Sequence, residues 1–298
     1  MSSPADPVPA ADLARLHVAV LAWFDDEARN LPWRGGASPW AIMVSEFMLQ
    51  QTPVQRVLPI YAAWMERWPT PAALATATTG EAVRAWSRLG YPRRALRLHA
   101  AAVAIVDQHD GDVPTALEDL LALPGVGAYT AAAISSFAFG GRHVVLDTNV
   151  RRVLGRIVRG EQFPAPSVTR TERDQAADLL PAQDAHRWAA ATMELGALVC
   201  TARSPRCGDC PVADLCRWRA AGYPAHSGPA RRGQTWEGTD RQCRGRLLAA
   251  LRASSDPVPR AALDLVWPDA IQRERALDGL IADGLVEAHP AECFALPG

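Results

Sequence analysis

The sequence contains no lysine, so all 31 of its basic side chains are arginines. A reaction that needs a lysine amine as its nucleophile is therefore excluded for this protein. The sequence also lacks an uncharged apolar run of about eighteen residues, which a membrane span would need. Its first residues show neither the basic segment nor the apolar segment of a signal peptide. We therefore expect a cytoplasmic protein that does not contact a membrane.

The net charge gives little indication of a partner, because 31 basic and 32 acidic residues leave a formal net charge of −1. The arginines are nevertheless clustered. Three arginine-rich segments lie at residues 84–97, 151–159 and 203–219. Local basic patches on a neutral chain can bind phosphate groups, although the same residues could also form solvated helix faces.

Apolar residues recur at helical spacing over most of the chain, and few alternating strand patterns occur before residue 230. The signals for helix starts are Ser38-Pro39, Thr70-Pro71, and Thr115 with Glu118 as a capping box. The main body is therefore predicted to be mainly α.

A stretch rich in glycine, proline and polar residues at 222–237 is predicted to be a linker. Three short helical patterns follow in residues 240–283. The last segment, GLVEAHPAECFALPG, is typical of two short strands around a turn. Three helices with a β-hairpin indicate a small winged-helix-like domain, which we expect over residues 238–298.

Four of the six cysteines are closely spaced, in a C-x6-C-x2-C-x5-C pattern. They are Cys200, Cys207, Cys210 and Cys216. Four thiolates at such spacing suit a tetrahedral metal ion or an iron–sulfur cluster. Disulfides are the competing interpretation, but the chain shows no export signal and the cytosol keeps thiols reduced. The spacing alone does not choose between zinc and iron–sulfur.

A helical hairpin is predicted around LPGVGAYTA, residues 123–131. Helices are expected over Thr115–Leu121 and Tyr129–Phe137, with the turn at residues 123–127. The glycines at 125 and 127 permit positive φ and close backbone approach. The N–H groups of residues 125–127 then lie at the start of a helix, where an anion such as a DNA phosphate is favoured.

Two carboxylates stand out by their surroundings. Glu46 lies within the apolar run WAIMVSEFMLQQT, and burial there would raise its pKa and favour the protonated acid. It could instead lie on an exposed stripe of the helix. Asp147 precedes a helix as a predicted N-cap, where the helix dipole favours the ionised form. One neutral acid beside one carboxylate is the arrangement that cleaves glycosidic bonds.

These motifs resemble the endonuclease III superfamily of DNA glycosylases, and most closely its adenine DNA glycosylase (MutY) branch, over roughly residues 12–221. The matching segments are LPWR (31–34), VSEFMLQQT (44–52), LGYPRRALRLH (89–99), LPGVGAYTAAAI (123–134), LDTNVRRV (146–153) and MELGALVC (193–200). The resemblance implies a helix-hairpin-helix glycosylase fold. A six-helix barrel domain would span 35–142. Residues 12–34 and 143–221 would form a cluster domain, whose four cysteines hold a 4Fe–4S cluster.

The resemblance also implies roles for individual residues. Glu46 would protonate a flipped adenine, and Asp147 would stabilise the sugar cation. Tyr129 and Asn149 would support these two carboxylates. The residues expected to contact DNA or the base are Arg34, Gln51, Thr52, Tyr91, Gly125, Val126 and Gly127. The expected partner is double-stranded DNA with adenine opposite 8-oxoguanine or guanine, bound by a monomer that associates with a bacterial nucleoid.

Three departures from the family keep alternatives open. Ala190 stands where the family usually carries Gln or Glu, so removal of thymine or uracil opposite guanine is an alternative. The segment DTNV replaces DGNV, and a winged-helix-like tail stands where a Nudix-like domain is usual. An endonuclease III-like thymine-glycol enzyme is disfavoured, because Tyr129 replaces its hairpin lysine. A non-catalytic iron–sulfur DNA-binding protein is the alternative from another class.

Overall fold

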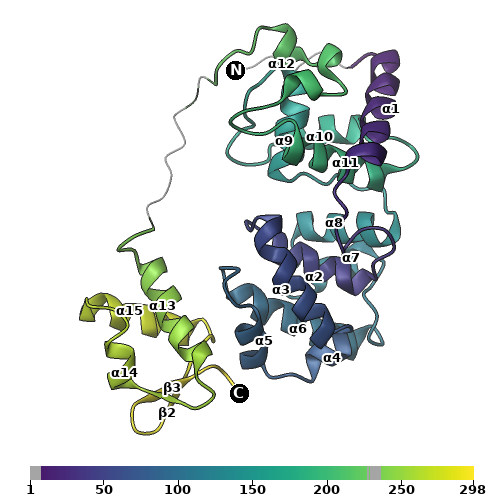
Figure 1. The fold of residues 1–298 in the computed structure, drawn as a ribbon. Helices are drawn as coiled ribbons and strands as arrows, with labels where there is room; N and C mark the ends of the chain where they lie inside the picture. Colours follow the sequence, from purple (N-terminus) through teal and green to yellow (C-terminus); the bar gives the residue numbers. More distant parts are fainter. Residues whose placement is uncertain (1–7, 227, 229–235) are drawn as a thin grey trace. The chain divides into compact units, whose positions relative to one another are not determined.

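The computed structural model describes residues 8–226, 228 and 236–298, and these residues are mostly helical (Figure 1). The mainly α prediction is confirmed. Within the described part of the chain, no helix is long and apolar enough to cross a membrane. The predicted linker at 222–237 includes residues 227 and 229–235, which lie outside the described residues.

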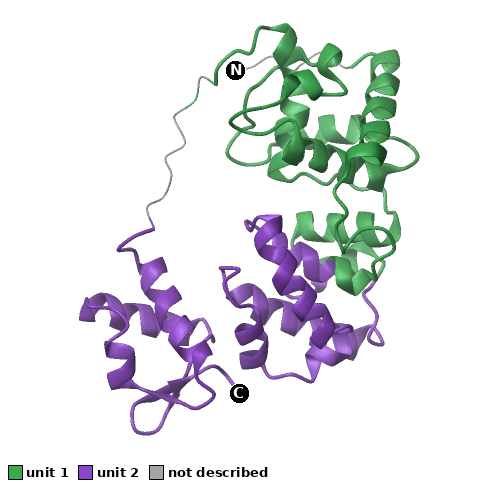
Figure 2. Ribbon diagram, viewed as in Figure 1, with its two compact units in different colours: residues 1–42, 115–121, 126–230 green, residues 43–114, 122–125, 231–298 purple. Residues whose placement is uncertain are grey.

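The chain forms two compact units (Figure 2). Unit 1 comprises residues 1–42, 115–121 and 126–230, and unit 2 comprises 43–114, 122–125 and 231–298. The units divide the chain differently from the predicted domains, whose boundaries remain a prediction. Two helices cross the division: α2 (Pro39–Leu49) and α7 (Leu117–Ala122).

Unit 1 is organised around α11, which packs on α1, α8 and α9. Its helices are α1 (Ala10–Glu27), α8 (Ala128–Phe139), α9 (Thr148–Leu154), α10 (Arg170–Asp178), α11 (Ala185–Leu198) and α12 (Arg217–Ala220). A π-helical turn, η1 (Gly155–Arg159), continues α9, and two short 3₁₀ turns, η2 (Cys207–Asp209) and η3 (Ala213–Leu215), lie between α11 and α12. The core joins Leu16 and Val20 of α1 to Val153 of α9 and Leu195 of α11, all of them buried.

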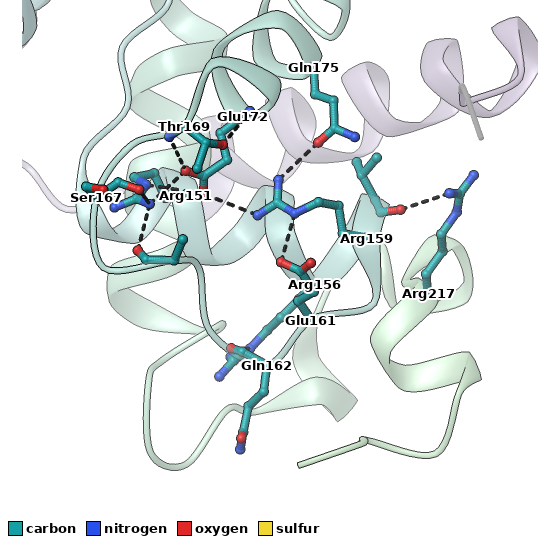
Figure 3. A network of polar contacts seen from close by, with 12 residues as sticks. Arg151, Arg156, Arg159, Glu161, Gln162, Ser167, Thr169, Glu172, Gln175 and Arg217 are labelled. Atoms are coloured by element: carbon teal, nitrogen blue, oxygen red, sulfur yellow. Dashed lines mark hydrogen bonds and ion pairs between the residues drawn. The ribbon is translucent and has the colours of Figure 1, made fainter. Parts of the chain in front are cut away.

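The arginine-rich segment 151–159 forms part of this core and is not a surface patch, so that interpretation is wrong. Arg151, Arg152 and Arg156 are all buried, and the Arg159 side chain is 13% exposed. Figure 3 shows where two of these arginines bind. Glu172 of α10 accepts hydrogen bonds from Arg151 Nη2 at 2.7 Å and from Arg159 Nη2 at 3.3 Å. Arginine clustering alone does not separate a phosphate-binding face from ion pairs of this kind.

The first part of unit 2 is organised around α6 (Arg93–Gln108), which packs on α4 (Pro71–Ala75) and α5 (Thr79–Ala85). Helix α3 (Val54–Arg67) precedes them in the sequence. The start signals at Ser38 and Thr70 are confirmed, since their side chains accept hydrogen bonds from Ala41 N and Ala73 N. The start predicted at Thr115 is wrong by two residues, because α7 begins at Leu117.

The end of unit 2 has the predicted winged-helix topology. Its elements are α13 (Asp240–Ala253), β1 (Val258–Pro259), α14 (Arg260–Asp264), α15 (Ala270–Ala282), β2 (Glu287–His289) and β3 (Cys293–Ala295). The strands form an antiparallel sheet in the order β1-β3-β2. Strand β1 could not be predicted, because a two-residue strand is too short to show an alternating pattern. This domain contacts the rest of unit 2 through Gly80 N to Pro297 O, at 2.8 Å, and Arg252 Nε to Val83 O, at 2.9 Å.

Candidate active site and cluster-binding loop

Glu46 lies in the apolar helix α2, and its side chain is buried. Only 6% of the residue is exposed, and Met43, Val44 and Phe47 beside it are exposed by 1% or less. The alternative that placed Glu46 on an exposed stripe is therefore excluded. A carboxyl group shielded from bulk water in this way can transfer a proton directly to a bound base.

Asp147 is the N-cap of α9, as predicted. Its Oδ1 accepts a hydrogen bond from Val150 N at 2.6 Å, and its Oδ2 accepts one from Asn149 Nδ2 at 2.9 Å. Burial raises the pKa of Asp147, while the bonds from Val150 and Asn149 and the charge of Arg152 lower it, and the net direction is upward. The helix N-terminus therefore orients this carboxylate but does not lower its pKa below the usual value.

A chain of hydrogen bonds runs from Asp147 to the cysteine-rich loop. Asn149 Oδ1 accepts from Arg152 Nη2 at 2.7 Å, and Arg152 Nε donates to Cys200 O at 2.8 Å. Arg152 Nη2 also donates to Gly196 O at 2.6 Å. Helix α11 approaches Asn149 so closely that a Cβ on Gly196 would lie 2.7 Å from Asn149 Cβ. The position of Asn149 is thus fixed from both sides.

The helical hairpin runs from α7 through a turn into α8. Gly125 has φ +79° and leaves no room for a side chain, since a Cβ there would lie 2.7 Å from Arg97 Cβ. Gly127 is the N-cap of α8, and the buried Val126 lies between the two glycines. The first N–H groups of a helix have no partner within the helix and favour an anion.

Tyr129 lies in the first turn of α8 and is half-buried. It packs at the edge of a small apolar cluster that includes Ala132, Val145 and Ala189. Asp147, Asn149 and Tyr129 belong to unit 1, while Glu46 belongs to unit 2. The structure joins Asn149 directly to Asp147, while Glu46 is carried by α2 and Tyr129 by α8.

The predicted DNA-contacting side chains Gln51 and Tyr91 lie on two loops of unit 2. Both have positive φ, 55° and 47°, which is uncommon for residues with side chains, and both are exposed. Thr52 is different, because its side chain is buried and its hydroxyl donates to Leu89 O at 3.1 Å. The Thr52 hydroxyl therefore joins the two loops and is not presented to solvent.

Arg34 is held by the buried carboxylate of Glu194, which no local pattern in the sequence marks as its partner. Glu194 of α11, whose side chain is 1% exposed, accepts from Arg34 Nη2 at 2.9 Å and from Arg29 Nε at 2.7 Å. Burial alone would raise the pKa of Glu194, but hydrogen bonds from Arg29 and Arg34 lower it to about 2. Ala190 lies one turn before Glu194 on the same helix.

The four closely spaced cysteines line one cavity, together with Arg156, Trp218 and apolar side chains of α9 and α11. All are free thiols, so the disulfide alternative has no support in the structure. Burial raises the pKa of Cys210 to about 11, and the charges of Cys200, Cys216 and Cys207 act in the same direction. Four thiolates this close repel one another unless a metal group balances their charge, so the donor set fits such a group.

Arg156 borders this cavity and is 1% exposed. Its Nη1 lies 3.3 Å from Cys200 Sγ and 2.8 Å from Thr201 O, and its guanidinium stacks over Trp218, with Cζ 4.5 Å from the ring centroid. A fixed positive charge beside a cysteine sulfur can balance the negative charge of a metal-bound cysteine. In the sequence, Arg156 is distinguished only by lying within an arginine-rich segment, and nothing there indicates its contact with Cys200.

Two family models match the chain. Residues 44–177 match the HhH-GPD superfamily base excision DNA repair proteins, and residues 200–216 match the iron–sulfur binding domain of endonuclease III. The second match identifies the cofactor as an iron–sulfur cluster, which is of the 4Fe–4S type in this family. The choice between zinc and iron–sulfur is thereby settled.

Individual relatives extend the similarity to most of the chain. A protein of Mycobacterium tuberculosis (strain ATCC 25618 / H37Rv) named adenine DNA glycosylase is 56% identical over 282 residues, which cover 94% of this chain and 92% of that protein. One of the same name from Mycolicibacterium smegmatis is 56% identical over 284 residues, covering 94% and 96%. The solved structure of a thermostable thymine-DNA glycosylase is 25% identical, with a TM-score of 0.64, and the likeness covers 71% of this chain and 98% of that one.

The ion pairs of Glu194 make a prediction about stability and pH. Because the folded pKa is about 2 and the ordinary value is 4.5, the charged form contributes stability above pH 4.5 that is lost as the pH falls toward 2. We expect Glu194→Gln to lower the free energy of unfolding by up to about 3 kcal/mol at pH 7. The difference from wild type should narrow by about 1 kcal/mol between pH 6 and pH 4.

Urea denaturation at pH 7, 6, 5 and 4, with iron content measured in parallel, checks this expectation. The matched control is Glu161→Gln, since the Glu161 side chain is 41% exposed and pairs with Arg159 at 2.9 Å. Because only the Glu161 side of this pair is exposed to solvent, removing its charge should change the free energy of unfolding by less than about 1 kcal/mol. Equal losses in the two variants would show that the buried carboxylate has no special contribution.

Proposed function

The chain belongs to the adenine DNA glycosylase family of base excision repair, and from this premise we propose that it removes adenine mispaired with 8-oxoguanine or guanine. The observation that supports this most is the pair of carboxyl groups at Glu46 and Asp147. Glu46 is 6% exposed within the apolar helix α2, and the oxygens of Asp147 are held by Val150 N and Asn149 Nδ2 at the start of α9. Two carboxyl groups can divide the acid role and the stabilising role between them when a glycosidic bond is cleaved.

Glu46 is the proposed general acid. An adenine must leave the base stack before a protein side chain can reach it. The neutral Glu46 then donates its proton to a ring nitrogen of adenine. The N-glycosidic bond breaks, its electron pair goes to the protonated adenine, and a cationic sugar remains.

Asp147 is the proposed stabiliser of that sugar cation. Its two oxygens are oriented by Val150 N and Asn149 Nδ2, so the carboxylate keeps its direction as positive charge develops. Water then adds to the anomeric carbon and releases a proton. Tyr129 offers a phenol in place of an amine, so no covalent bond forms between the protein and the sugar. The DNA strand therefore stays intact and contains an abasic site.

The remaining site residues are proposed to hold the DNA. The N–H groups at Gly125–Gly127 bind a phosphate at the start of α8, without reading the sequence. Gln51 and Tyr91 enter the duplex from their two loops, and Arg34 contributes to the adenine pocket. The protein acts as a monomer on double-stranded DNA. Its cytoplasmic, nucleoid-associated location stays a prediction.

Cys200, Cys207, Cys210 and Cys216 are the proposed ligands of the 4Fe–4S cluster. When bound to these cysteines, the cluster would cross-link the loop between α11 and α12 and would supply no group to the hydrolysis. Arg156 then balances negative charge at Cys200, because its guanidinium is fixed 3.3 Å from that sulfur.

A second function is favoured by one observation. Ala190 has no group that could read the hydrogen-bonding edge of adenine, and it lies one turn from Glu194 on α11. The similarity to a thymine-DNA glycosylase structure, at 25% identity, points the same way. Removal of thymine or uracil opposite guanine is therefore the alternative to be tested.

Single-turnover excision on a panel of duplexes tests the proposed reaction. The panel contains adenine opposite 8-oxoguanine, guanine and thymine, and thymine or uracil opposite guanine. We expect wild type to release adenine from the first two duplexes. Glu46→Gln and Asp147→Asn should each lower that rate by about 1,000-fold or more, because each removes one of the two carboxyl functions. Wild-type rates in either variant would contradict the assigned roles, and release of thymine or uracil alone would favour the alternative.

The absence of lysine makes a separate prediction about the product. We expect base release to leave the DNA strand uncut until base is added, with no covalent protein–DNA adduct after borohydride reduction. Denaturing gels with and without hydroxide treatment measure both properties. A lysine-dependent lyase of the same superfamily serves as the positive control for trapping. Efficient strand cleavage without added base would show that another group attacks the sugar.

A further inference from the structure

The loops that carry Gln51 and Tyr91 are close neighbours in unit 2, and both hold their exposed residue in a strained conformation. Gln51 follows the end of α2, and Tyr91 precedes the start of α6. Positive φ at a residue with a side chain costs free energy and persists only where the surroundings enforce it. Something on the inner side of these loops must therefore fix both of them.

Arg94 lies beneath both loops and is 6% exposed. One amino group, Nη1, donates to two carbonyls at the end of α2, Phe47 O at 2.8 Å and Met48 O at 3.1 Å, and to Gln50 O of the first loop at 2.6 Å. The other, Nη2, donates to Gly90 O of the second loop at 3.0 Å and to Thr52 Oγ1 at 3.1 Å.

These acceptors place the guanidinium directly behind the two exposed side chains. Gln50 precedes Gln51 and Gly90 precedes Tyr91, so each carbonyl belongs to the peptide unit that leads into a strained residue. The Arg94 guanidinium also faces the Tyr91 ring, with Cζ 5.5 Å from the ring centroid. Trp86 is fully buried on the same side, and its Nε1 donates to Gly90 O at 3.0 Å.

The two amino groups of Arg94 donate to neutral oxygens. Every acceptor given above is a carbonyl or a hydroxyl, and two of them, Phe47 O and Met48 O, lie in the last turn of α2, where a cation is favoured. Burial lowers the pKa of Arg94 to about 10, which leaves it protonated at neutral pH. An ion pair would have held the Arg94 guanidinium at a single carboxylate, whereas these hydrogen bonds connect it to both loops.

We propose that Arg94 is a positioning residue that fixes the Gln51 loop and the Tyr91 loop relative to each other, so that both side chains enter the DNA duplex together. This inference rests on the proposed function, which gives these two side chains their role in extruding the base. Arg94 itself is buried and acts only through the loops. Arg94 therefore contributes to the alignment of the Gln51 and Tyr91 side chains and not to the chemistry at the sugar.

The planar guanidinium is essential to this arrangement, because its two amino groups point in different directions at a fixed angle. A lysine ammonium keeps the charge but offers three donors from a single atom, so it cannot bridge both sets of carbonyls. Arg94→Lys is thus the informative variant. Arg252→Lys is the matched control, since Arg252 is also an arginine of unit 2 whose pKa burial lowers to about 10, and it donates to Val83 O.

The test is a double-mutant cycle in single-turnover excision of mispaired adenine by the holoenzyme. We expect Arg94→Lys to slow excision on the order of 30-fold, because misplacement by about 1 Å is costly in a reaction that depends on alignment. In a Gln51→Ala/Tyr91→Ala background the same substitution should slow excision by less than about threefold, since the side chains that it positions are gone. Arg252→Lys should leave the wild-type rate within about twofold.

Equal slowing by Arg94→Lys in both backgrounds would overturn the proposal. Such a result is expected if Arg94→Lys only lowers folding stability, because its effect on the rate would then be independent of the Gln51 and Tyr91 side chains. A wild-type rate for Arg94→Lys would also overturn it. If wild type releases no adenine from the mispaired duplex, the proposed function fails instead. If Arg94→Lys does not fold, Thr52→Val removes a hydroxyl that joins the two loops, and its smaller slowing must show the same dependence on the Gln51 and Tyr91 side chains.

Discussion

The orientation of the Asp147 carboxylate depends on one series of hydrogen bonds, which runs from Asp147 through Asn149 and Arg152 to the main-chain carbonyl of Cys200. A catalytic carboxylate is useful only if its direction is fixed before charge develops beside it. The N-cap bond to Val150 fixes one oxygen, and this series fixes the other. These hydrogen bonds therefore connect the cysteine-rich loop to the proposed catalytic carboxylate within unit 1.

Arginine makes such connections because its guanidinium carries several donors in a fixed plane. Arg152 and Arg156 each bond to main-chain carbonyls of the cysteine-rich loop, and Arg94 does the same for the two loops of unit 2. In each case a buried guanidinium donates to neutral carbonyl oxygens of a segment that is distant from it in sequence. The absence of lysine thus accompanies a way of joining loops that lysine could not reproduce.

Local signals in the sequence were sufficient for much of the fold and the site. Ser38 and Thr70 start helices because their side chains cap the next turn, and Asp147 is found as an N-cap for the same reason. The ion pair of Arg34 with Glu194 could not be predicted, because 160 residues separate the partners. Arg94 gave no signal either, since its acceptors are mainly backbone carbonyls, which every residue carries.

The central claim is that the hydrogen bonds linking Asp147, Asn149, Arg152 and Cys200 O orient the Asp147 carboxylate. The Arg152→Lys variant tests this claim most directly. The single-turnover rate of adenine release and the iron content are measured on the same holoenzyme preparation. We predict a fall in rate on the order of 100-fold with iron content unchanged, because the orientation of Asn149 is lost while the cysteines remain. A wild-type rate at full iron content would contradict the account.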